Sequence, residues 1–266
     1  MDLSTLPKAA QIAMLGQGAP RWRPGLAGAR VLHSEIFAPG DEAGGAACAL
    51  SLALDGMRAL SVEEQARLAE KPLLWVQDAL SIRRTGRPYR PGLPPALRHR
   101  VIHVATKDAA DALFALEEGM RCRDLACVIG EIAGNPRALD LTASRRLGLA
   151  AQRHGVPLFL VRHDAARDIS SARMRWQVHS THSPPLRWNP AAPQAGAGTG
   201  SWHVELFRSR AHAPGEWILH DDGRTLIAER PPARQEDGDV ATQGLATPPD
   251  HGDLAGPAGD RSLAAG

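Results

Sequence analysis

The sequence predicts an α/β protein with a mainly parallel sheet and an antiparallel extension toward its C-terminal end. Apolar, strand-like runs alternate with helix-like segments across residues 31–161. After residue 162, further strand-like runs follow one another with no helical pattern between them. Parallel strands need a crossover, usually a helix, whereas antiparallel strands can be joined by turns. A chain of 266 residues is long enough for one such domain with appended segments.

The first strand, turn and helix begin where a Gly/Pro/Arg-rich stretch ends. Residues 31–37 predict a strand, residues 38–45 a glycine-bearing turn, and residues 46–60 an Ala/Leu-rich helix. Four more strands and two more helices follow. We expect the strands at 73–76, 101–105, 125–129 and 157–161, and the helices at 108–121 and 141–154.

The C-terminal part of the predicted domain contains strands without helices between them. These strands are expected at 173–179, 202–208 and 216–220, with a Pro/Gly/Ala-rich loop at 183–201. We therefore divide the chain into an N-terminal arm and linker (1–30), a core (31–225) and an acidic Pro/Gly-rich tail (226–266). The arm contains a possible short helix at 3–15, and we expect the tail to be disordered.

Charge and composition restrict the classes of function. Residues 236–266 carry a net charge of −5, so residues 1–235 carry +7, which permits nucleic-acid binding without proving it. No apolar run approaches the ~20 residues of a membrane span. The N-terminal sequence does not resemble a signal peptide, so we expect a cytoplasmic protein. We expect neither a disulfide nor a metal site at the three cysteines, Cys48, Cys122 and Cys127.

Several stretches of the sequence resemble known proteins. Four segments are similar to the entry strand and closing strands of the RecA core: 34–39, 204–210, 213–215 and 217–219. Four others are similar to the ImuA family, the RecA-like member of a bacterial mutagenesis cassette: 111–122, 128–132, 139–147 and 171–178. The order of these segments is more specific than any one of them. The resemblance covers about residues 31–222 and implies a RecA-like core of the P-loop NTPase type.

The phosphate loop implied by this resemblance is degenerate. A working loop needs Gly-x4-Gly-Lys-Ser/Thr, because backbone amides wrap the phosphates, the lysine neutralises charge and the hydroxyl holds magnesium. In either alignment, glycine stands at the lysine position, and glycine or alanine at the hydroxyl position. Two carboxylates would also oppose a triphosphate. The degenerate loop comprises Pro39, Gly40, Asp41, Glu42, Gly44, Gly45 and Ala46.

The acidic residues expected beside such a loop are also altered. Where a Walker-B aspartate would follow the strand at 125–129, the sequence has Gly130 and Glu131. Asp78 follows the strand at 73–76, near the position of the RecA catalytic acid. The alternative is structural: a carboxylate at a strand end that caps a turn or pairs with an arginine. We favour that alternative and predict no catalytic residue, no metal and no cofactor.

The resemblance implies a non-catalytic accessory protein in SOS-linked translesion DNA synthesis and damage-induced mutagenesis. Its implied partners are RecA and ImuB, and through them the translesion polymerase complex, with nucleoid association during DNA damage. The arm at 3–15 is a candidate self-association element.

Two other functions remain open. A single-stranded DNA-binding protein is suggested by basic residues in segment 79–107 and by a second group after residue 161; the alternative is a solvated basic face. An NTPase with an irregular site is the weakest hypothesis, since nothing supplies the missing lysine. The basic residues are Arg83, Arg84, Arg87, Arg90, Arg98, Arg100 and Lys107, then Arg162, Arg167, Arg173 and Arg175.

Overall fold

The computed structural model describes residues 19–26, 32–183, 200–222 and 224–231. The chain divides into two compact units, Met1–Pro231 and Pro232–Gly266, and the second lies wholly outside the described residues. The predicted arm helix at 3–15, most of the loop predicted at 183–201 and most of the predicted tail also lie outside them.

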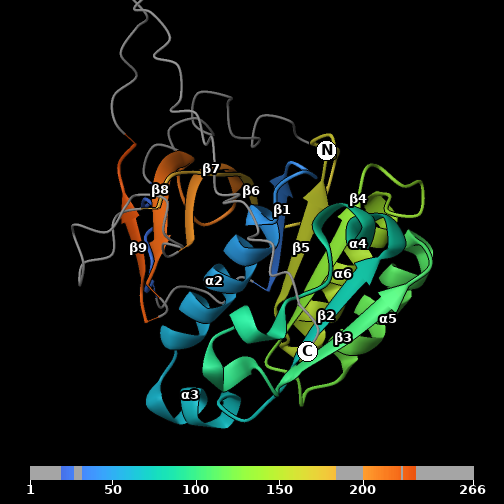
Figure 1. The fold of residues 1–266 in the computed structure, drawn as a ribbon, viewed down its shortest axis with the longest axis horizontal. Coiled ribbons are helices and arrows are strands. Elements are labelled where there is room, and N and C mark those ends of the chain that lie inside the picture. The colour runs from blue at the N-terminus through green and yellow to red at the C-terminus, as the bar shows by residue number, and fades with distance from the viewer. Residues whose placement is uncertain (1–18, 27–31, 184–199, 223, 232–266) are drawn as a thin grey trace, which may run out of the picture. The chain divides into compact units, whose positions relative to one another are not determined.

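The described residues form an α/β unit with a mixed sheet of nine strands (Figure 1). The strand order is β3-β2-β4-β5-β1-β6-β7-β8-β9. The strands are β1 His33–Ala38, β2 Leu73–Asp78, β3 Val101–Thr106, β4 Cys127–Ala133, β5 Leu158–His163, β6 Met174–Ser180, β7 Gly200–Ser209, β8 Gly215–Asp221 and β9 Leu226–Glu229.

Five α-helices and two short 3-10 helices connect the strands in the described part of the chain. The α-helices are α2 Gly44–Arg58, α3 Val62–Leu68, α4 Ala79–Thr85, α5 Ala109–Arg121 and α6 Leu141–His154. The 3-10 helices are η2 Arg90–Gly92 and η3 Pro95–Leu97. None of the helices within these described ranges is long and apolar enough to cross a membrane.

The mainly parallel sheet with an antiparallel extension is confirmed, with one correction. Strands β3, β2, β4, β5, β1 and β6 run parallel, and β7, β8 and β9 continue the sheet antiparallel to their neighbours. The run predicted at 173–179 as the first antiparallel strand is β6, which pairs parallel with β1 on one side and antiparallel with β7 on the other. The antiparallel extension therefore begins one strand later than predicted.

Helices cover the parallel part of the sheet on both faces. On one face, α2 packs against β1, β4, β5, β6 and β7 over an apolar cluster that includes Trp75, Phe159 and Trp176. On the opposite face, α5 and α6 pack over a second cluster that includes Leu116 and Leu147 (Figure 1). Both faces of β4 and β5 are thus buried, as the continuous apolar run at 125–129 predicted.

The helices predicted at 108–121 and 141–154 are α5 and α6, with bounds that agree to within one residue. The carboxylate of Asp108 accepts a hydrogen bond from the Asp111 N–H at 3.0 Å, so α5 begins directly after it. In α6 the carboxylate of Asp140 accepts from the Ala143 N–H at 2.7 Å. Gly155 ends α6 in the left-handed conformation, with φ +71°. Local capping residues therefore determine where both helices begin and where α6 ends.

Three short elements were missed. Helix α3 has no buried residue and is held by a capping box between Ser61 and Glu64. Helix α4 has seven residues, and β9 has four. Because β9 pairs with β8 and buries Leu226, the segment 226–229 belongs to the folded unit and not to the tail as predicted.

Candidate functional site

The loops at the carboxyl ends of the parallel strands form the candidate site. In open α/β sheets, ligands bind at this edge because neighbouring loops converge there. The segment interpreted from its sequence as a degenerate phosphate loop lies here, between β1 and α2. The ends of β2, β4 and β5 lie at the same edge, so Asp78, Glu131 and the β5–β6 loop belong to the same region.

The two positions at which a phosphate-loop lysine could stand are closely packed. A Cβ atom added to Gly45 would lie 2.5 Å from the Cβ of Ala38 and 3.2 Å from Val161. At Gly44, an added Cβ would collide with the Ser180 hydroxyl and lie 3.3 Å from Trp202. Neither glycine could become lysine without movement of its neighbours, and Ala46 is itself buried against the core.

Two other residues of the loop are held by contacts within the protein. The buried Gly40 donates its N–H to the Asp164 carboxylate at 2.8 Å. Glu42 accepts a hydrogen bond from the Ser180 N–H at 2.7 Å, which ties the loop to the end of β6. Asp41 is exposed, and Pro39 is half-buried. The loop is therefore anchored to β5 and β6 by its own polar groups.

Asp78 has the structural role expected of a carboxylate at a strand end. It is buried, and its carboxylate accepts a hydrogen bond from the Ser81 N–H at 2.6 Å at the start of α4. The second oxygen accepts from the Ala133 N–H at 3.4 Å. Asp78 thus joins the end of β2 to the end of β4.

The prediction that Glu131 lies at a strand end, where it caps a turn or pairs with an arginine, was wrong. Strand β4 continues to Ala133, so Gly130 and Glu131 lie within the strand and not after it. A Cβ on Gly130 would lie 2.8 Å from the Leu116 side chain, so this position packs tightly against α5. The Glu131 carboxylate is buried and neither caps a turn nor pairs with an arginine among the described residues.

Four side chains lie within hydrogen-bonding distance of the Glu131 carboxylate. One oxygen accepts from the Trp75 indole at 2.6 Å and the Gln77 amide at 3.0 Å; the other accepts from the Thr85 hydroxyl at 3.2 Å. The second oxygen also lies 2.8 Å from Nε2 of the buried His163. Both oxygens of this carboxylate therefore face polar side chains of the protein, and the single hydroxyl hydrogen of Thr85 is shared with the Ser81 carbonyl at 3.1 Å.

The first predicted basic group is divided by the structure. Arg84 pairs with Asp164, while Arg90 donates to the Val101 carbonyl at 3.1 Å. Arg98 and Arg100 donate to backbone carbonyls of the surrounding loops. Lys107 pairs with Asp111 on α5. Within the described ranges, Arg83 and Arg87 remain exposed and form no ion pair.

The second basic group lies largely inside the protein, which corrects the nucleic-acid assignment of Arg175. Arg175 is 3% exposed, and its Nε donates to Glu35 at 2.8 Å. Arg162 is equally buried, donates to the Gly134 carbonyl at 3.1 Å, and has a pKa lowered by burial. Arg173 is half-buried. Arg167 is more exposed but pairs with Glu205.

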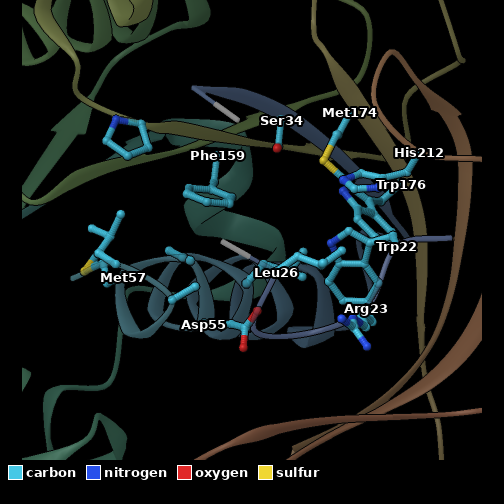
Figure 2. Close-up of a pocket in the computed structure, with 16 residues that line it drawn as sticks. Trp22, Arg23, Leu26, Ser34, Asp55, Met57, Phe159, Met174, Trp176 and His212 are labelled. Carbon is cyan, nitrogen blue, oxygen red and sulfur yellow. The ribbon is translucent and has the colours of Figure 1, made fainter. Parts of the chain in front are cut away.

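Sequence reasoning missed an apolar cavity at the opposite end of the strands. A space of about 130 Å³ lies beside the C-terminal half of α2, lined by Phe159, Met174 and Trp176 (Figure 2). Trp22 also lines it and meets Trp176 edge to face, with ring centroids 4.9 Å apart. The carboxylate of Asp55 accepts from the Gly25 N–H at 2.9 Å. The sequence feature that could have indicated this cavity is Trp22, a large apolar residue in a stretch that otherwise resembles a linker.

The described residues contain neither a candidate metal site nor a disulfide. No group of three or more metal-ligating side chains occurs in the part of the chain that the structure describes. All three cysteines are free; Cys48 and Cys127 are buried, while Cys122 is exposed. Burial raises the pKa of the Cys127 thiol to about 12, which disfavours the thiolate.

Comparison with known proteins connects the chain to one group of relatives. No protein-family model matches the sequence. Over 138 residues, the chain is 33% identical to Protein ImuA from two strains of Caulobacter vibrioides. The matched region is 48% of this chain and 52% of the relative, so the chain spans about half the length of the curated relatives it matches. Over that region, the chain is similar to Protein ImuA of Caulobacter vibrioides.

Proposed function

We propose that the protein is an ImuA-like, RecA-derived accessory protein that acts in damage-induced mutagenesis without binding or hydrolysing nucleotide. The similarity to Protein ImuA over 138 residues supports its place in the ImuA/ImuB mutagenesis system. The order of elements supports the RecA-like part: a strand, a glycine-bearing loop and a helix, then parallel strands, then antiparallel strands.

The environment of Glu131 is the observation that carries the non-catalytic part of this proposal. A Walker-B acid must keep an oxygen available for a magnesium-bound water or the ion itself. Here Trp75, Gln77, Thr85 and His163 surround both oxygens of the buried carboxylate. The packing at Gly44 and Gly45 supports the same conclusion, because no lysine fits there in this arrangement.

A protein that keeps an α/β core without nucleotide chemistry would act through its surfaces. We propose ImuB as the direct partner and RecA as the second, with the translesion polymerase complex reached through them. The corresponding test is capture of purified ImuB and RecA from the same genome by the full chain, with and without ATP and magnesium. We expect capture of ImuB that does not depend on nucleotide; capture that requires ATP would contradict the proposal.

A second candidate function is single-stranded DNA binding through α4 and the residues after it. The exposed Arg83 and Arg87 favour it, because neither forms an ion pair with another described residue. Burial, and then the positive charge of Arg87, lower the pKa of the nearby His103. The charge of Glu131 opposes the effect of Arg87 on this pKa.

Replacing Arg83 and Arg87 together with alanine tests this second function. If both arginines contact phosphates, the slope of log affinity against log salt falls by about 1.4, at ~0.7 per contact for a single strand. The measurement is fluorescence anisotropy of a labelled oligonucleotide at several salt concentrations. The control replaces the exposed Arg67 and Arg153, on α3 and α6, and changes the net charge equally. An unchanged slope, or the same change in both variants, excludes this surface.

A further inference from the structure

We infer that Asp164 is a built-in anion that occupies a phosphate position at the β1–α2 loop. When its carboxylate is removed or moves aside, the same donors bind the phosphate group of inorganic phosphate or of a phosphate ester. This inference rests on the proposed loss of nucleotide binding and supplies a physical reason for it.

Two donors of the kind that bind phosphate converge on the Asp164 side chain. The Gly40 N–H donates to one carboxylate oxygen at 2.8 Å, and the Arg84 guanidinium forms an ion pair with the other. A backbone N–H in a glycine-bearing loop and an arginine are typical donors to oxyanions. Gly40 and Asp164 directly follow β1 and β5, and Arg84 lies in the last turn of α4, the helix that follows β2, so both donors lie at the ligand-binding edge of the sheet.

The position is shaped around a glycine. A Cβ atom added to Gly40 would collide with the Asp164 carboxylate and lie 2.7 Å from a terminal nitrogen of Arg84. The loop backbone can therefore approach an anion only because residue 40 has no side chain. The approach is made to a carboxylate of the same chain, 124 residues away in the sequence.

The backbone of Asp164 is also unusual. Its φ of +48° makes it the one non-glycine residue with positive φ in the described part of the chain. Such conformations are costly for residues other than glycine and persist when surrounding contacts hold them. Here the Asp164 N–H donates to the Ala38 carbonyl at 3.0 Å, so both its backbone and its side chain bind the segment around the β1–α2 loop.

Solvent has access to this contact. The side chains of Arg84 and Asp164 are 35% and 47% exposed, so a phosphate ion can reach the guanidinium without unfolding of the site. Arg83 and Arg87 lie exposed nearby in sequence on and after α4 and add positive charge. The exposed Asp41 opposes an anion. A partly exposed site with one arginine and one amide should bind phosphate weakly, in the millimolar range.

The test is isothermal titration of the full chain with sodium phosphate at constant ionic strength. The variant is Asp164→Gly, which removes the competing carboxylate; glycine suits the positive φ and so offsets part of the stability lost with the contact to Gly40. We expect saturable binding to this variant with a Kd of about 1–10 mM, at least roughly tenfold tighter than to the wild type. Adding Arg84→Met should remove that gain.

Asp168→Gly is the matched control, because Asp168 is an exposed acid of the same β5–β6 loop whose removal changes the charge equally. We expect it to behave as the wild type. The inference is overturned if Asp164→Gly does not bind phosphate, if the wild type binds it equally well, or if Asp168→Gly gains the same affinity. These outcomes leave capture of ImuB unaffected, whereas ATP binding by the wild type would contradict the proposed function itself.

Discussion

Replacing Arg175 with methionine is expected to lower the free energy of unfolding by roughly 3–5 kcal/mol. Arg175 and Glu35 are 3% and 0% exposed, and the Arg175 Nε donates to the Glu35 carboxylate at 2.8 Å. The guanidinium also lies 5.0 Å from the ring centroid of Phe37 and 5.3 Å from that of Phe207. Without Arg175, the buried carboxylate would keep, among the described residues, the hydrogen bond from the Ser170 hydroxyl and the more distant charge of Arg162.

Urea unfolding at pH 7 measures this effect, and a double variant separates its causes. Replacing Glu35 and Arg175 together with methionine removes the ion pair without leaving one charge unpaired. Because buried pairs are often replaced by apolar groups at little cost, we expect the double variant to recover most of the lost stability. A loss below about 1 kcal/mol in the single variant would show that Glu35 does not depend on Arg175.

Protonation of the buried His33 is expected to make the stability of the protein depend on pH. His33 in β1 is 1% exposed, and neither ring nitrogen has a hydrogen-bond partner among the described residues. Burial lowers its pKa from 6.5 to about 4; the charge of Glu35 partly opposes this shift, and that of Arg175 adds to it. The unfolded chain therefore binds this proton at a higher pH than the folded protein does.

The sign of the pH dependence follows from this difference. Above pH 6.5, His33 is neutral in both the folded and the unfolded state and does not lower the free energy of unfolding. As the pH drops toward 4, the free energy of unfolding falls, because the unfolded state gains a proton first. A difference of about 2.5 pKa units corresponds to about 3 kcal/mol over that range. Carboxylates also titrate there, so the comparison is between the wild type and His33→Leu in urea unfolding from pH 7 to pH 4.5.

We expect His33→Leu to be at least as stable as the wild type at pH 7, since it removes a buried polar ring without partners. From pH 7 to pH 4.5, the free energy of unfolding of this variant should fall by about 2–3 kcal/mol less than that of the wild type. Parallel pH profiles for the two proteins would mean that His33 is not held neutral in the folded state.

The parts of the fold that local sequence determines were predictable. Helices α5 and α6 match the prediction because Asp108, Asp140 and Gly155 determine their ends within a few residues of chain. The direction of β6 was not predictable, because its pairing with β1 depends on a segment about 140 residues earlier. The short α3, α4 and β9 lack the length over which a hydrophobic period is recognisable.

The candidate site shows the same division between local and distant information. The absence of a lysine and a hydroxyl at Gly44, Gly45 and Ala46 is visible in the sequence. The environment of Glu131 is not, because its donors lie on β2, β5 and the end of α4. The burial of Arg175 likewise depends on Glu35, so a cluster of arginines in the sequence did not correspond to a basic surface.

Titration with a fluorescent ATP analogue and magnesium tests whether this core binds nucleotide. The full-length protein is titrated beside an active RecA protein as the positive control. We predict no saturable signal for this protein, because polar side chains surround both oxygens of its Glu131 carboxylate and its loop is packed at both possible lysine positions. Saturable, magnesium-dependent binding with a stoichiometry near one would contradict the account and return the NTPase hypothesis to first place.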